Sequence, residues 1–93
     1  MSGGYFDYRQ WQIRQIQDDI QQVITYNDNT DKNEWGDEIG KHFSPEIIRR
    51  FRVAITALKM AEAMTQRIDY LLSGDDADDA FLRRWDDDMR ELK

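Results

Sequence analysis

Apolar residues recur every three or four positions along three stretches of the chain, and each stretch predicts an amphipathic helix. The first covers residues 5–26, where one face carries Phe6, Ile13, Ile16, Ile20, Val23 and Ile24. The other faces carry six glutamines: Gln10, Gln12, Gln15, Gln17, Gln21 and Gln22. We therefore expect the isoleucine face of this helix to contact the core and the glutamines to face solvent.

The second stretch predicts the longest helix, over residues 45–73. Ser44 is a good cap, Pro45 suits the first helical position, and Gly74 is a typical residue to follow a helix end. A first seam of apolar and small residues runs through the whole element: Ile47, Phe51, Ala54, Leu58, Ala61, Thr65, Ile68 and Leu72. A second seam lies beside it: Val53, Ala57, Met60, Met64 and Leu71. Two seams predict a central helix with a neighbour on each side.

The third helix is expected over residues 75–92. Its apolar face is formed by Ala77, Phe81, Leu82, Trp85, Met89 and Leu92. A long loop, 27–44, separates the first two helices, and we expect its Trp35, Ile39 and Phe43 to pin it to the core. We expect residues 1–4 to be a flexible N-terminus. The predicted fold is a single all-α domain, a small three-helix bundle with a long central helix and a long first loop.

Composition restricts the function. The 93 residues include no cysteine, which excludes disulfides and thiolate zinc sites. No stretch is long and apolar enough for a bilayer, and no secretory leader is recognisable, so we expect a cytoplasmic protein without membrane contact. The net charge of −6 argues against direct nucleic-acid binding and favours a protein partner with a basic surface.

Acidic residues of the third helix are the first candidate binding site. On its outer face we expect Asp76, Asp79, Asp86 and Asp87. Such a face could dock on a basic, nucleic-acid-binding groove by imitating phosphates. The alternative is a solvated face, because Arg83 and Arg90 lie between the carboxylates at the spacing of intrahelical ion pairs.

Two further surfaces are candidates for protein contacts. Tyr8, Trp11 and Tyr26 fall opposite the apolar face of the first helix, where they could anchor a partner or pack under the long loop. The second seam offers more apolar surface than one short neighbour needs. It therefore predicts an alternative, a homodimer formed through Val53, Ala57, Met60, Met64 and Leu71.

Catalytic and metal-binding patterns are weak. The series Asn27, Asn29, Asp31 and Glu38 matches four ligand positions of a calcium loop, but Lys32 stands where that loop needs glycine. His42 is the only histidine and has no nucleophile or ligand set beside it in the sequence. We predict no catalytic residue, no metal site and no cofactor.

Two clusters of charge have open roles. The carboxylate pairs Asp18-Asp19, Asp75-Asp76 and Asp78-Asp79 invite comparison with Mg²⁺-dependent helical nucleotide hydrolases, which need converging carboxylates. Arg49, Arg50 and Arg52 oppose the dipole at the start of the long helix. They would be balanced by the acidic loop or by a bound phosphate or acidic partner.

Four segments resemble those of small acidic proteins encoded by phages, prophages and other mobile elements. They are Trp35-Gly36-Asp37, Ser44-Pro45-Glu46, Gln66-Arg67-Ile68-Asp69-Tyr70 and Ser73-Gly74-Asp75-Asp76. The resemblance implies a host-directed binder that blocks a host enzyme or defence system, as anti-CRISPR proteins do. Our leading hypothesis is thus a non-enzymatic inhibitor of a nucleic-acid-handling complex. The alternatives are a structural homo-oligomer and, third, a helical-bundle hydrolase.

Overall fold

The computed structural model describes residues 4–92 and contains three helices: α1 (Trp11–Thr25), α2 (Pro45–Leu72) and α3 (Asp78–Glu91). The all-α class and the long central helix are confirmed. The described residues form no strand, only an isolated bridge between Lys32 and Glu38. No helix within residues 4–92 has the length and apolar character needed to span a membrane.

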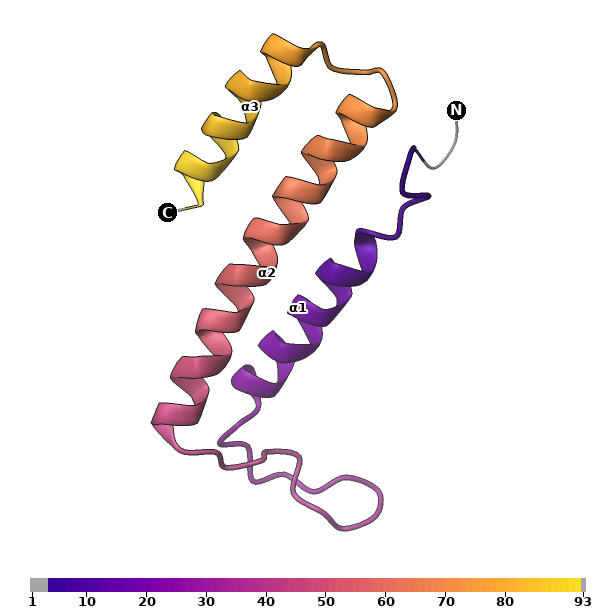
Figure 1. The fold of residues 1–93 in the computed structure, drawn as a ribbon. Helices are drawn as coiled ribbons and strands as arrows, with labels where there is room; N and C mark the ends of the chain where they lie inside the picture. Colours follow the sequence, from indigo (N-terminus) through magenta and orange to yellow (C-terminus); the bar gives the residue numbers. More distant parts are fainter. Residues whose placement is uncertain (1–3, 93) are drawn as a thin grey trace.

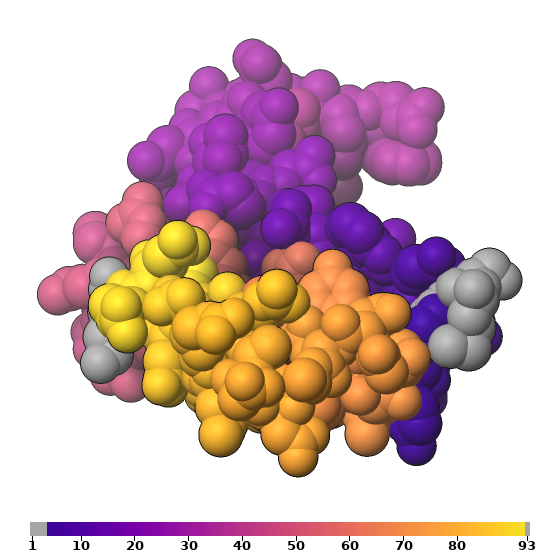
Figure 2. All heavy atoms as spheres, turned by 90° about the horizontal axis from the view of Figure 1, so that it is seen from above, coloured from indigo at the N-terminus to yellow at the C-terminus, as the bar shows by residue number. Residues whose placement is uncertain are grey.

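The three helices lie side by side in one thin layer (Figure 1). Helix α2 is the middle element; α1 packs along one of its sides and α3 along the C-terminal half of the other. Within the described chain α1 and α3 do not contact each other. The Cα atoms span 54 × 29 × 13 Å, so the molecule is flat. The loop between α1 and α2 forms a separate lobe behind the helices in Figure 2.

The contact face of α1 differs from the predicted one. Its buried residues are Gln17 and Ile24, and Gln10 and Asn27 continue the same line at either end, whereas Ile16 is exposed. The reason is polar pairing with α2. Gln10 Nε2 donates to Gln66 Oε1 at 2.8 Å, and Gln17 Nε2 donates to Glu62 Oε1 at 2.8 Å. A buried amide is tolerated when it finds such a partner, so these two glutamines occupy positions that the pattern gave to solvent.

Helix α1 also starts later than residue 5. Asp7 and Tyr8 have φ values of +57° and +63°, which a right-handed helix does not allow. Residues 4–10 instead form turns that fold back on α2. There the buried Asp69 carboxylate accepts the backbone N–H groups of Tyr5 (2.6 Å) and Phe6 (3.0 Å) on its Oδ1 atom. This contact replaces the helical turn that the periodicity predicts.

Helix α2 begins as its local signals predict. The Ser44 hydroxyl accepts the Ile47 N–H at 3.4 Å, and Gly74 follows the helix with φ at +82°. The core beneath α2 is small: its buried apolar side chains are Ile24, Ile48 and Ile55, with Ile20 and Phe51 packed against them. The buried line of α2 therefore passes beside the first seam rather than through it.

Helix α3 starts at Asp78, later than the predicted 75. Residues 73–77 form a linker in which the Tyr70 carbonyl accepts the Asp75 N–H at 2.8 Å. Phe81 and Trp85, whose ring centroids are 5.6 Å apart, are half-buried. Leu82 is 64 % exposed, so its assignment to the apolar face is wrong.

Candidate functional site

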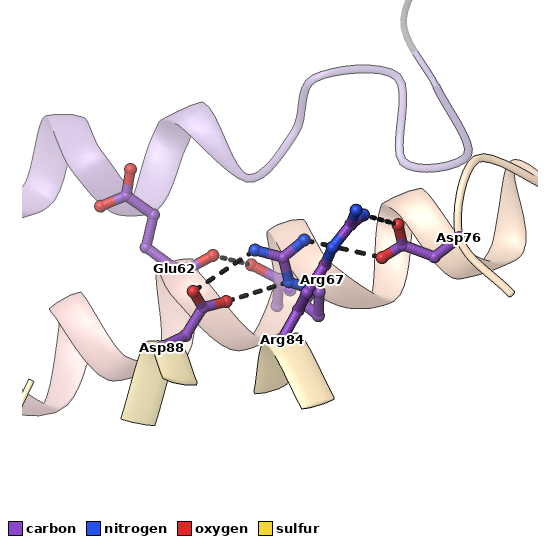
Figure 3. A network of polar contacts seen from close by, with 6 residues as sticks. Glu62, Arg67, Asp76, Arg84 and Asp88 are labelled. Atoms are coloured by element: carbon purple, nitrogen blue, oxygen red, sulfur yellow. Dashed lines mark hydrogen bonds and ion pairs between the residues drawn. The ribbon is translucent and has the colours of Figure 1, made fainter. Parts of the chain in front are cut away.

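Asp76 is not part of an exposed acidic face. It lies in the linker before α3 with its side chain 2 % exposed, and it forms ion pairs with Arg84 and, at 3.6 Å, with Arg67 (Figure 3). Its expected place on the outer acidic face is therefore wrong. A carboxylate can be buried here because two guanidinium groups approach it.

The same ion-pair network attaches α3 to α2. Arg67 of α2 binds Asp88 of α3 with two hydrogen bonds, Nε to Oδ2 at 3.0 Å and Nη2 to Oδ1 at 3.3 Å. The hydrogen bond with Asp88 raises the pKa of Arg67 above its usual value. Arg67 thus joins three segments at once: α2, the linker with Asp76, and α3.

Three of the predicted acidic residues are exposed. Asp79, Asp86 and Asp87 are accessible on α3, and Asp87 lies 3.5 Å from Arg90. This i,i+3 pair is exposed at both ends, and such pairs contribute little to stability. The three carboxylates remain candidates for a partner contact, at the edge of the layer away from α1.

The predicted aromatic residues do not form one surface. Tyr8 and Trp11 line a common hollow with Gln66 and Tyr70, and both are more than half exposed. Tyr26 lies at the opposite end of α1. Because α1 and α3 each contact α2 and not each other, these aromatics and the acidic side chains of α3 belong to different sides of α2.

The second seam is divided along its length. Met60, Met64 and Leu71 are half-buried, and helical spacing puts them near the side of α2 on which Arg67 meets α3. Val53 is 68 % exposed and Ala57 is also exposed, because α3 does not reach this part of α2. Only a fraction of the seam is therefore available for the expected homodimer.

The loop after α1 is an ordered ribbon of two antiparallel segments, residues 27–43. Backbone hydrogen bonds link its sides at four levels: His42 N to Asn27 O, Gly40 N to Asn29 O, Ile39 N to Asp31 O, and Asn33 N to Asp37 O, at 2.8–3.0 Å. Asparagine side chains add further bonds, as expected for residues that favour turns. This internal bonding lets the ribbon project without being packed on the helices.

Asn27 fixes the base of the ribbon. Its buried side chain accepts the Phe43 N–H at 2.8 Å and donates to the Phe43 carbonyl at 3.0 Å. The Phe43 ring packs edge-on against Phe51 of α2, with centroids 5.6 Å apart. Phe43 therefore contacts the core as predicted, although it is partly exposed.

Trp35 stands at the tip of the ribbon instead of pinning the loop. Its side chain is 78 % exposed, more than any other large apolar residue in the described chain. The tip is defined by Asn33, whose Oδ1 accepts the N–H groups of Trp35 (2.9 Å) and Asp37 (3.1 Å), and by Gly36 at φ +86°. The turn residues Asn33 and Gly36 were the sequence signal that could have identified this hairpin.

Gly40 is required by the backbone packing of the ribbon. A Cβ atom at this position would lie 2.5–2.6 Å from the carbonyl oxygens of Tyr26, Asn27 and Asn29. Gly40→Ala is therefore expected to force the two sides apart and break the bonds between them. Hydrogen exchange should become faster at the Ile39, Gly40 and His42 amides while α3 amides are unchanged. Unchanged exchange in the ribbon would contradict this account. Thr30→Ala, at an exposed ribbon position without a positive φ, is the matched control.

The residues of the calcium-loop pattern are engaged in hydrogen bonds within the ribbon. Lys32 pairs with Glu38 across the ribbon, and Glu38 contacts His42. Among residues 4–92 there is no group of three or more His, Asp or Glu side chains arranged to hold a metal ion. Asp18 and Asp19 are exposed on α1, far along the chain from the carboxylates of the linker and α3.

The arginine cluster at the start of α2 is only partly balanced. Arg50 lies 3.7 Å from Glu46 in an exposed pair, and Arg49 and Arg52 line a hollow that also includes Asp28. The base of the ribbon thus supplies one acidic neighbour.

Comparison of the chain with protein-family models, with curated proteins and with solved structures finds no match.

Proposed function

We propose that this chain is a non-enzymatic protein-binding module that uses the ribbon as its contact element and Trp35 as its anchor. The exposure of Trp35 at the end of an internally bonded ribbon is the observation that carries this proposal. Burying an indole releases a large apolar surface from water, and tryptophan is enriched among residues that dominate binding energy. Since the ribbon is already ordered, little conformational entropy is lost on binding.

The charges of the ribbon specify the chemistry of the partner. Around Trp35 the tip carries Glu34, Asp37 and Glu38, and residues 27–44 sum to −3. A complementary surface has an apolar pocket for the indole and basic residues at its rim. Opposite charges of this kind speed association and suppress wrong partners.

A basic groove that normally holds nucleic acid offers this combination. We therefore propose a nucleic-acid-handling protein as the partner and steric block of its groove as the mechanism, with Asp79, Asp86 and Asp87 as a second acidic contact. The resemblance to mobile-element proteins supports a host-directed, anti-defence role within the cytoplasm. In this mechanism no residue of the chain performs chemistry.

The proposal predicts a large effect of Trp35→Ala on binding and almost none on folding. We expect at least about a 30-fold loss of affinity, which corresponds to the roughly 2 kcal/mol of an interface hot spot. The measurement is affinity capture from bacterial lysate with the wild-type chain, identification of the captured protein, and titration of that purified protein. The thermal unfolding midpoint should be unchanged, because the side chain is exposed.

Two control variants distinguish the alternatives. Trp11→Ala removes an exposed indole from α1 and should leave the affinity within a few-fold. The triple variant of Asp79, Asp86 and Asp87 to Lys should weaken binding mainly at low salt, because exposed charges are screened. If Trp11→Ala abolishes binding and Trp35→Ala does not, the contact lies on α1 and the ribbon proposal is wrong.

A further inference from the structure

The first seam of α2 lies on an open face of the helix layer. Successive helix residues are 100° apart, so the seam falls between the side that contacts α1 and the side that contacts α3. The side chains at its two ends are exposed, Ile47 by 41 % and Leu72 by 49 %, and the residues between them are half-buried or exposed. The exposed Ile16 of α1 and Leu82 of α3 extend the same apolar face on either side by their helical positions.

This seam is complementary to itself when reversed. Antiparallel alignment about its midpoint sets Ile47 opposite Leu72, Phe51 opposite Ile68, Ala54 opposite Thr65, and Leu58 opposite Ala61. At the centre a large residue meets a small one, and in the next layer two small residues meet, which permits close approach of two helices. The seam residues recur at spacings of three and four, so all four pairs lie on the same side of each α2 helix, as in an antiparallel coiled coil.

We propose that a second copy of this chain docks on this face, with the two α2 helices antiparallel across a two-fold axis near Leu58 and Ala61. A two-fold interface requires one surface patch that fits itself, and the reversed seam meets that requirement. The inference does not depend on the ribbon or its partner, because the ribbon projects as a separate lobe.

The lengths of the helices support the same arrangement. Helix α2 has 28 residues and α3 has 14, so α3 covers about half of one side of α2. Antiparallel pairing brings the α3 helix of the second copy toward the uncovered half, where Val53 and Arg50 are exposed. Since α3 carries six carboxylates and three arginines, its charge is opposite to that of the arginine cluster on α2.

The exposed area is consistent with a dimer. The chain exposes 7082 Å², whereas a compact monomer of 11.2 kDa exposes about 5,700 Å². A standard interface removes about 800 Å² from each partner. Docking on the open face would therefore remove roughly half of the exposed area that exceeds that of a compact monomer. It would also cover the exposed apolar residues of that face.

Engineered cysteines test the pairing, because the chain has none of its own. The double variant Ala54→Cys with Thr65→Cys should form covalent dimers on mild oxidation, since each cysteine faces the other type in the second copy. The two positions in one helix are about 16 Å apart along its axis, too far for an internal disulfide. Ala54→Cys alone should stay uncrosslinked in an antiparallel dimer.

Mass measurements complete the test. Sedimentation equilibrium at tens of micromolar should give twice the 11.2 kDa of one chain. Ala61→Glu should give the monomer mass, and Thr56→Glu, at an exposed position on the opposite face of α2, should retain the dimer. Circular dichroism checks that each variant is folded. A wild-type monomer across this range, efficient crosslinking by Ala54→Cys alone, or a dimer lost in Thr56→Glu but kept in Ala61→Glu would each overturn the proposal.

Discussion

Replacing Asp76 by alanine is expected to lower the free energy of unfolding by about 3–5 kcal/mol, the usual cost of breaking a buried ion pair by removing one partner. The Asp76 side chain is 2 % exposed and faces both Arg67 and Arg84. Its removal leaves Arg67, itself mostly buried, with the Asp88 carboxylate alone. The linker then no longer holds α3 in place.

Urea unfolding followed by tryptophan fluorescence and by circular dichroism measures this effect. Asp79→Ala is the matched control, because it removes an exposed carboxylate from the same region and should change stability by less than about 0.5 kcal/mol. Replacing Arg67 by methionine should also destabilise the fold, since Asp76 and Asp88 would then be left without their shared cation. Equal midpoints for Asp76→Ala and Asp79→Ala would show that the network contributes nothing.

Replacing Asp69 by alanine should cost about 2–4 kcal/mol. This buried carboxylate accepts two backbone N–H groups from residues 5 and 6, and hydrogen bonds to charged groups contribute more than neutral ones. Its Oδ2 atom also lies 3.5 Å from Gln10 Nε2. Without the carboxylate, the turns before α1, with positive φ at Asp7 and Tyr8, lose the contact that holds them against α2.

A truncated chain separates this local role from a general packing effect. In a chain that lacks residues 1–9, Asp69→Ala should cost much less than in the full chain, because its backbone donors are already gone. Thermal unfolding of the four proteins forms a double-mutant cycle, which isolates the coupling between Asp69 and the N-terminal turns. Equal costs of Asp69→Ala in the full and the truncated chains would exclude this coupling.

The features that could be predicted from the sequence are those set by local signals. Ser44, Pro45 and Gly74 define the ends of α2, and their caps and backbone preferences need no distant partner. The helical class followed from periodicity for the same reason. The start of α1 could not be predicted, because the turns before it depend on Asp69, more than sixty residues away.

The candidate site was harder to predict because burial of polar groups is decided by tertiary partners. The sequence pattern predicts that Gln10 and Gln17 face solvent. They are buried because Gln66 and Glu62 of α2 accept their side-chain hydrogen bonds. The sequence likewise predicts that Asp76 is an exposed carboxylate, because the ion pairs with Arg67 and Arg84 that bury it depend on the tertiary fold. Trp35 was expected to pin the loop to the core, whereas the bonds within the ribbon keep it in solvent.

The absence of contact between α1 and α3 has a consequence for how this fold opens. Each outer helix is held by α2 alone, so either can detach without exposing the surface that binds the other. Partial unfolding therefore divides into two independent events, one releasing α3 with the linker and one releasing α1 with the turns before it. Loss of α3 would uncover Met60, Met64 and Leu71 while the Ile24, Ile48 and Ile55 core stays closed. The chain can thus lose the contact of one outer helix with α2 while the other outer helix stays bound.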